Sequence, residues 1–176
     1  MAKWKFEPGH TAAEFCVRHM MVTYVRGYFK NIAGALEFDP GRPEIGSVEV
    51  EIAAATLWSD EPDRDAHLKS ADFLDVANHP KILFRSTRVE PTARNEYKVA
   101  GDVTIRGVTR PVVLDVRYLG ESRSPFDDTR AGFVATARID RHDFGVSWNS
   151  DMEDSGVVVG AEVLITIDVE AIREPA

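Results

Sequence analysis

Two short runs of the sequence combine histidine with acidic side chains, the combination that acid–base catalysis and metal binding use. Asp65 and His67 stand two residues apart, and residues 140–143 read Asp-Arg-His-Asp. Residues two apart on a helix do not share a face, and neighbouring residues of a strand alternate between faces. Neither run therefore converges on one point. We expect Asp65 to serve the start of a helix and residues 140–143 to form a solvated strand end.

His19, Arg106 and Arg110 could instead bind the polar end of a ligand. His19 continues the apolar face begun by Phe15 and Val17, where it either hydrogen-bonds a ligand carbonyl or amide or serves as a structural histidine. Arg106 and Arg110 surround a turn, and arginines bind the oxygens of a diphosphate through bidentate hydrogen bonds. Residues in such a turn commonly satisfy backbone groups or pair across the strands, and we favour that role.

The sequence contains none of the motifs that mark well-known catalytic or metal sites. It has no His-x-His, no His-Glu-x-x-His, no nucleophile elbow and no glycine-rich phosphate loop. Cys16 is the single cysteine, so it can form neither an intrachain disulfide nor a zinc site built from several cysteines. We therefore expect no catalytic residue, no metal ligand and no cofactor.

Composition and charge are those of an ordinary globular protein of one domain, residues 1–176. The net charge of −8 argues against nucleic acid as a partner and against electrostatic docking on anionic membranes. The first residues show no apolar run of signal-peptide length, and no stretch approaches the roughly 18 apolar residues of a membrane-spanning helix. We expect a cytoplasmic protein without stable membrane insertion.

Alternation of apolar and polar residues dominates the chain and predicts about eight strands, mostly joined as hairpins. The alternation is interrupted once, where the apolar side chains of residues 64–77 can gather on one side of a short helix. We expect Arg64 or His67 to tie this helix to the barrel rim. Antiparallel chains with this number of strands commonly close into barrels, because closure removes exposed edges. The predicted fold is an all-β, extended eight-stranded antiparallel barrel with one inserted helix.

An eight-stranded barrel either fills its interior with side chains or holds one small ligand. The inward-facing set mixes large aromatic residues with Gly101, Ala54, Ala135 and Ala137, which suits either interior, so both stay open. Two apolar segments are candidates for covering the barrel mouth: residues 20–25, and residues 146–156 with Trp148 and Met152. The second of these could also form a dimer contact.

Spaced motifs run in order along nearly the whole chain: Trp4; Phe15-x-Val17-x-His19; Gly27-x-Phe29 with Gly34 and Phe38; Arg64-Asp65-x-His67-Leu68 with Asp72-Phe73; Pro80-x-Ile82-x-Phe84-x-Ser86-Thr87; Gly101-Asp102-Val103-Thr104-Ile105-Arg106-Gly107-Val108-Thr109; and Asp143-Phe144-Gly145. Together they resemble the YceI-like family of lipid-binding barrels, also called polyisoprenoid-binding proteins. Several motifs in the right order make this resemblance far more specific than any one of them.

The resemblance implies an extended, lipocalin-like barrel whose pore holds a long apolar chain, such as a polyprenyl phosphate, a quinone tail or a fatty amide. Family members are often dimers and many are periplasmic, so the resemblance also implies a homodimer. This chain shows no export signal, which favours a cytoplasmic carrier or reservoir over a periplasmic shuttle.

Burial of about 0.8 kcal/mol per methylene would hold such a chain without any directed contact. The inward-facing residues expected to touch the lipid are Phe15, Val17, His19, Phe29, Leu36, Phe38, Val50, Ile52, Leu68, Phe73, Phe84, Val103, Leu114, Phe133 and Ile165. Two other interpretations stay open. One is an enzyme acting on such a lipid or quinone, with His19 or His67 as the acid–base group. The other is a stress-response dimer with a solid core.

Overall fold

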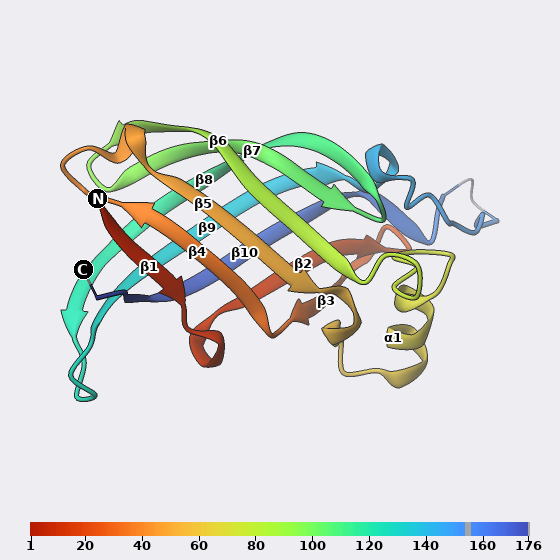
Figure 1. The fold of residues 1–176 in the computed structure, drawn as a ribbon. Coiled ribbons are helices and arrows are strands. Elements are labelled where there is room, and N and C mark those ends of the chain that lie inside the picture. The colour runs from red at the N-terminus through yellow and green to blue at the C-terminus, as the bar shows by residue number, and fades with distance from the viewer. Residues whose placement is uncertain (154–155, 176) are drawn as a thin grey trace.

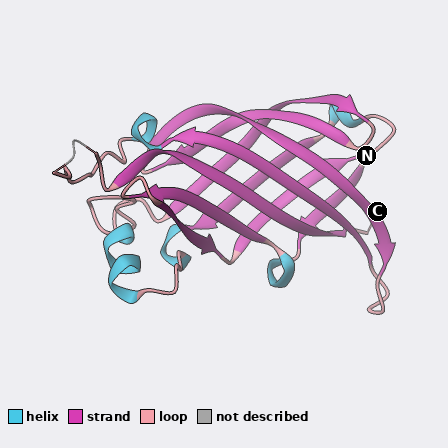
Figure 2. Cartoon of the chain, turned by 180° about the vertical axis from the view of Figure 1, so that it is seen from behind, coloured by secondary structure: helices cyan, strands magenta, loops and turns pink. Residues whose placement is uncertain are grey.

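Long antiparallel strands wrap around one axis and close on themselves (Figure 1). This computed structural model describes residues 1–153 and 156–175. The strands are β1 (Ala2–Phe6), β2 (Ala12–His19), β3 (Thr23–Phe29), β4 (Ile32–Phe38), β5 (Ser47–Ala53), β6 (Lys81–Ala93), β7 (Glu96–Ile105), β8 (Val108–Arg123), β9 (Thr129–Asp140) and β10 (Val159–Arg173). The strands form the wall, and the helical segments lie outside it or at its ends (Figure 2).

The ten strands make eight wall positions, because two wall positions are each occupied by a broken strand. β1 and β2 follow one another along the same side of β10, separated by a 3₁₀ turn at Pro8–His10. β3 pairs with β2, and β4 pairs with β1. The break between β3 and β4 contains Asn31, whose backbone is in the left-handed region at φ 56°. The eight-stranded antiparallel barrel expected from the sequence is confirmed.

The barrel closes along β10, which pairs with β9 on one side and with β2 and then β1 on the other. The seam loses its regular ladder at the break between β1 and β2. There the buried hydroxyl of Thr11 donates to the carbonyl of Glu170 and accepts from its amide, at 3.3 Å in both cases. The Glu170 carbonyl also accepts from the Glu7 amide at 2.7 Å, so the Thr11 side chain chiefly satisfies the Glu170 amide where the neighbouring strand is interrupted.

The one α-helix within the described residues is shorter than expected and lies at one end of the barrel. α1 spans Pro62–Lys69, whereas the sequence predicted a helix over residues 64–77. Beyond Lys69 the amides of Leu74 and Val76 bond back to the carbonyls of Leu68 and Lys69, so the chain continues as turns. The apolar residues after Lys69 still reach the interior, but through turns rather than along one helical face.

The start of α1 also differs in detail from the expectation. The side chain of Glu61 caps the helix by accepting from the amides of Asp63 and Arg64. Asp65 lies in the first turn and accepts from the amide and hydroxyl of Ser59 instead. Arg64 donates to the hydroxyl and carbonyl of that same serine, so both side chains tie the helix to the segment before it.

Replacing Thr11 by valine tests the seam, because valine keeps the shape of the side chain but removes its hydroxyl. Leaving the Glu170 amide without this partner should lower the free energy of unfolding by about 1–3 kcal/mol, measured by urea denaturation. Thr87→Val is the matched control, since the exposed Thr87 hydroxyl makes one 3.3 Å bond to the carbonyl of Ala100. Equal stability of the two variants would contradict the role given to Thr11.

Candidate ligand cavity

An apolar cavity of about 290 Å³ lies inside the barrel, close to the lower bound of about 300 Å³ for known ligand sites. Its walls come from strands all round the barrel and from the segment that follows α1. All fourteen apolar residues expected to face a ligand line it: Phe15, Val17, Phe29, Leu36, Phe38, Val50, Ile52, Leu68, Phe73, Phe84, Val103, Leu114, Phe133 and Ile165. His19, at the end of β2, is absent from the lining among the described residues.

The space exists because small residues stand beside large ones on the inner face. A Cβ added at Gly101 would lie 2.5 Å from both the Arg85 carbonyl oxygen and the Phe84 ring, so only glycine lets that ring lie against the wall. Ala135 and Ala137 line the cavity from β9 and leave the centre open. The small residues therefore accommodate aromatic rings near the wall without filling the axis of the barrel.

Aromatic rings from four strands gather at the end of the barrel away from α1. The Phe38 ring centroid lies 5.7 Å from that of Tyr97, 5.0 Å from Tyr118 and 5.2 Å from Phe133. Burial raises the pKa of the Tyr97 and Tyr118 phenols, so both remain neutral at physiological pH. Of the two tyrosines, Tyr97 lines the cavity and carries a polar atom into this apolar cluster.

The opposite end is closed by α1 and by the segment after β9. His67 on α1 lies between the rings of Phe73, at 5.0 Å, and Trp148, at 4.7 Å, and its Nε2 is 2.9 Å from a carboxylate oxygen of Asp72. Arg106, in the turn between β7 and β8, donates to the Phe73 carbonyl. The two closing segments are therefore held to each other and to the barrel wall.

Arg141 is the polar residue of this end that sequence reasoning missed. The sequence predicts a solvated strand end here, but Arg141 is 4 % exposed and contributes to the cavity lining. Its guanidinium donates to the carbonyls of Val146, Trp148, Val159 and Gly160 at 2.7–3.1 Å. Burial lowers its pKa, and among the described residues no carboxylate hydrogen-bonds to it. The sequence around it carries no signal for this placement, because its partners are all backbone groups of other segments.

The remaining polar candidates are engaged in local structure. Arg110 bonds to the carbonyl of Thr109 and Arg106 to that of Phe73, so both guanidiniums satisfy backbone groups, the role favoured for this turn. The hydroxyls of Thr104 and Thr109 pair across the hairpin at 2.7 Å, as favoured for this turn. Of the apolar segment at residues 146–156, positions 154 and 155 lie outside the described residues.

One group of side chains within the described ranges has the composition of a metal site. Glu7, His10 and Glu170 place one ligand atom each within 4.8 Å of one another, on the outside of the barrel at the seam. His10 already bonds to Glu7 at 2.6 Å and holds the pKa of that carboxyl below its usual value, while Arg130 binds Glu170. This group lies apart from the cavity, and its donors satisfy one another.

In the part of the chain that the structure describes, there is no helix with the length and hydropathy needed to cross a membrane.

The chain resembles known proteins both in sequence and in fold. Residues 4–171 match the family model described as the YceI-like domain. A curated relative from Azotobacter vinelandii, named UPF0312 protein, is 34% identical over 168 residues, which is 96% of this chain and 84% of the relative.

Two solved structures share the fold at lower identity. Burkholderia cenocepacia BcnA superposes with a TM-score of 0.83 at 22% identity, covering 94% of this chain and 98% of that one. A domain from Saccharophagus degradans, described as a polyisoprenoid binding domain implicated in plant cell wall breakdown, gives a TM-score of 0.67 at 10% identity and covers 99% of each chain.

The role of Arg141 can be tested by Arg141→Met, which keeps much of the side-chain length but removes the guanidinium donor from the Val146, Trp148 and Gly160 carbonyls, while the Val159 carbonyl keeps its bond from Asn149. We expect the free energy of unfolding to fall by at least about 3 kcal/mol, with faster hydrogen exchange at residues 146–149. Arg138→Met is the control, because Arg138 makes an exposed ion pair with Glu162 and its loss should cost less than about 1 kcal/mol. Unchanged exchange at residues 146–149 would show that Arg141 does not hold this end closed.

Proposed function

We propose a function from two premises: the chain belongs to the YceI-like domain family, and its closed barrel surrounds an apolar cavity. The protein binds a long-chain isoprenoid or a related amphiphilic lipid, such as a polyprenyl phosphate, a quinone or a fatty amide. It encloses the apolar chain of this lipid inside the barrel and so sequesters or carries it through water.

The cavity is the observation that carries this proposal. Its lining is almost entirely apolar from the aromatic cluster at one end to Phe73 and Phe144 at the other. A lipid chain placed there gains about 0.8 kcal/mol for each methylene removed from water. The neutral Tyr97 phenol and the Arg141 guanidinium lie at opposite ends, so the middle of the cavity is left to the chain alone. The printed description of the Saccharophagus degradans domain as polyisoprenoid binding supports the same class of ligand.

Encapsulation explains the site better than catalysis does. The two histidines considered as acid–base groups do not contribute to the described cavity lining. His67 is held by Asp72, Phe73 and Trp148 at the closing end, where it joins two segments. We propose that α1 and the segment after β9 move apart when the lipid enters or leaves. A carrier returns its ligand chemically unchanged, whereas an enzyme would not.

The homodimer and the cytoplasmic location stay predictions. The mass of the purified protein in solution tests the first, and fractionation of the source cells tests the second.

Native mass spectrometry of freshly purified protein, followed by solvent extraction and identification of the lipid, tests the proposal. We expect a bound species of defined mass that belongs to a long-chain lipid class and is released unaltered. Protein that is empty, and that takes up neither polyprenyl nor quinone lipids when these are added, would favour the solid-core interpretation.

Ala135→Phe tests whether the cavity is the binding site. Ala135 points into the cavity from β9, and a phenyl ring there would take the space of roughly four methylene groups at about 0.8 kcal/mol each. We expect retained lipid to fall at least about tenfold, or to shift to shorter chains, in the same mass measurement. Val134→Phe adds the same side chain on the outer face of the strand and should retain lipid as the unaltered protein does. Equal retention by both variants would place the lipid elsewhere.

A further inference from the structure

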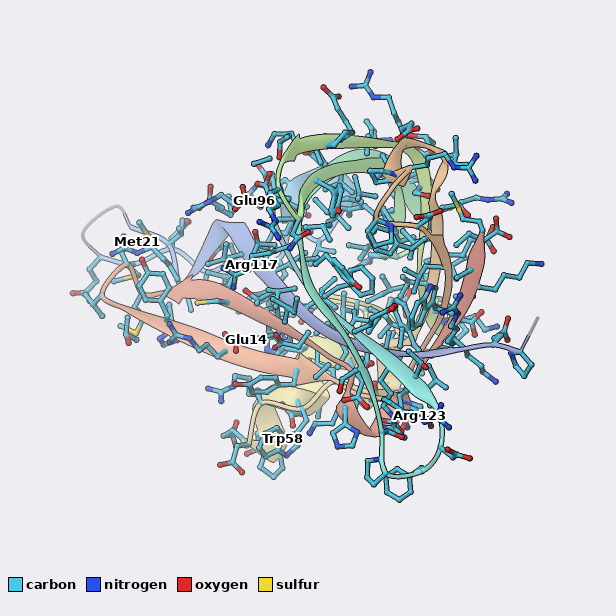
Figure 3. The ribbon with its side chains drawn as sticks, turned by 90° about the vertical axis from the view of Figure 1, so that its left-hand side faces the viewer. Glu14, Met21, Trp58, Glu96, Arg117 and Arg123 are labelled. Carbon is cyan, nitrogen blue, oxygen red and sulfur yellow. The ribbon has the colours of Figure 1, made fainter. Side chains whose placement is uncertain are left out.

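The hairpin formed by β2 and β3 extends beyond the closed part of the barrel. Among the described strands, β3 pairs only with β2, and a single backbone bridge joins Tyr28 to Trp58 on its other side. The hairpin turn lies at the end of the barrel where α1 lies (Figure 1). Viewed along the barrel, Met21 lies at the outer end of this hairpin, away from the barrel axis (Figure 3).

Large apolar side chains are concentrated at this turn, although the interior is available for such residues. Met20 is 41 % exposed, Met21 47 %, Val22 80 % and Tyr24 52 %; we call these four residues the apolar tip. They do not contribute to the described cavity lining, so the apolar tip does not cover the mouth as the sequence suggested for residues 20–25. A contiguous exposed group of this kind marks a surface that contacts an apolar partner.

The backbone holds the apolar tip in a costly conformation. Met20 and Met21 both adopt left-handed φ angles, 50° and 61°, where glycine or asparagine would be less strained. The turn is nevertheless anchored: Arg18 donates to the Met21 carbonyl, and the Met20 amide donates to the Val158 carbonyl, both at 2.8 Å. Two methionines therefore occupy positions that backbone geometry alone would assign to smaller residues, which indicates that their side chains are needed outside.

The charge around the apolar tip is opposite to that of the whole chain. Arg18 and Arg26 are the charged residues on the strands next to this turn; Arg26 also pairs with Glu14 of β2 at 3.6 Å, whereas Arg18 makes no ion pair among the described residues. The guanidinium carbons of Arg18 and Arg26 lie 5.4 and 5.8 Å from the centroid of the Tyr24 ring. Asp151 and Glu153 belong to the adjoining segment and Glu14 lies further along β2, so the positive region is confined to the part of the hairpin nearest its turn.

We propose that the apolar tip docks reversibly on the surface of a lipid bilayer that contains anionic lipids. Methionine and valine side chains enter the boundary between headgroups and acyl chains, Tyr24 lies at headgroup level, and the arginines meet lipid phosphates. The net charge of the whole chain argues against such docking. Salt, however, limits the range of each charge's electrostatic interaction to about 8 Å, so the charges nearest the bilayer determine whether it attracts the protein. A second copy of the chain is a less suitable partner, because two hairpins of the same positive sign repel.

This docking goes beyond the proposed function. It rests on lipid binding only for its biological role, which is to deliver or collect the bound lipid. The apolar tip is hydrogen-bonded to Val158, immediately before β10 in the segment that follows β9. Contact with a bilayer would therefore bring the closing end of the barrel to the source or destination of its lipid.

Flotation with vesicles tests the docking directly and separately from lipid content. The full chain is mixed with vesicles of phosphatidylcholine and phosphatidylglycerol in equal parts, and with vesicles of phosphatidylcholine alone. We expect binding to the mixed vesicles, weaker binding without the anionic lipid, and at least a roughly tenfold loss of binding in Val22→Asp. Val22 is so exposed that this variant should fold and retain bound lipid in native mass spectrometry as the unaltered protein does.

Phe126→Asp is the matched control. Phe126 is a 75 % exposed apolar residue in the hairpin between β8 and β9 at the other end of the barrel, beside Asp127 and Asp128. It should leave vesicle binding unchanged. The proposal is overturned if the unaltered protein fails to bind mixed vesicles, if Phe126→Asp loses binding as Val22→Asp does, or if Val22→Asp only dissolves a dimer seen by light scattering. Each of these results leaves the lipid found by mass spectrometry unaffected, so failure of docking and failure of lipid binding are distinguished.

Discussion

The pairing of β10 on both of its edges is the constraint on which the rest of this structure depends. Each backbone N–H and C=O in a sheet needs a partner, and an open sheet leaves two edges without one. Here β10 takes β9 on one edge, and β2 and β1 in succession on the other. Because two short strands must follow one long strand, the first wall position is broken at Pro8–His10, and Thr11 satisfies Glu170 beside the break.

Closure also determines what kind of interior the chain can have. Once the wall is closed, the inner faces of its strands bound a fixed volume, and the sizes of the inward-facing residues decide how much of it is filled. Gly101 lets the Phe84 ring lie close to the wall, and Ala135 and Ala137 reach only a short way inward. The remaining space is apolar because alternation sends polar residues outward, where cross-strand pairs such as Arg85 with Glu49 and Lys98 with Asp115 form.

The two ends of the barrel are closed by different structural elements. At one end four aromatic rings pack against one another from the strands themselves. At the other end the closing pieces are loops and a short helix, and a loop carries backbone groups that a strand would have paired. Arg141 supplies donors to four such carbonyls, so a buried cation stabilises a closure that the sheet cannot provide. The hairpin of β2 and β3 projects from this same end with its apolar tip exposed.

The sequence by itself determined the wall and its inner face, because a period of two residues decides which side chains share a face whatever strand lies next to it. The eight-stranded barrel and the positions of residues such as Phe84 and Phe133 could therefore be predicted. Only the tertiary structure decided the end of α1 at Lys69, the burial of Arg141, the exclusion of His19 from the cavity lining and the exposure of Met21. These features depend on which loops and backbone groups, distant in the sequence, become neighbours when the barrel closes. A local sequence pattern carries no information about such tertiary contacts.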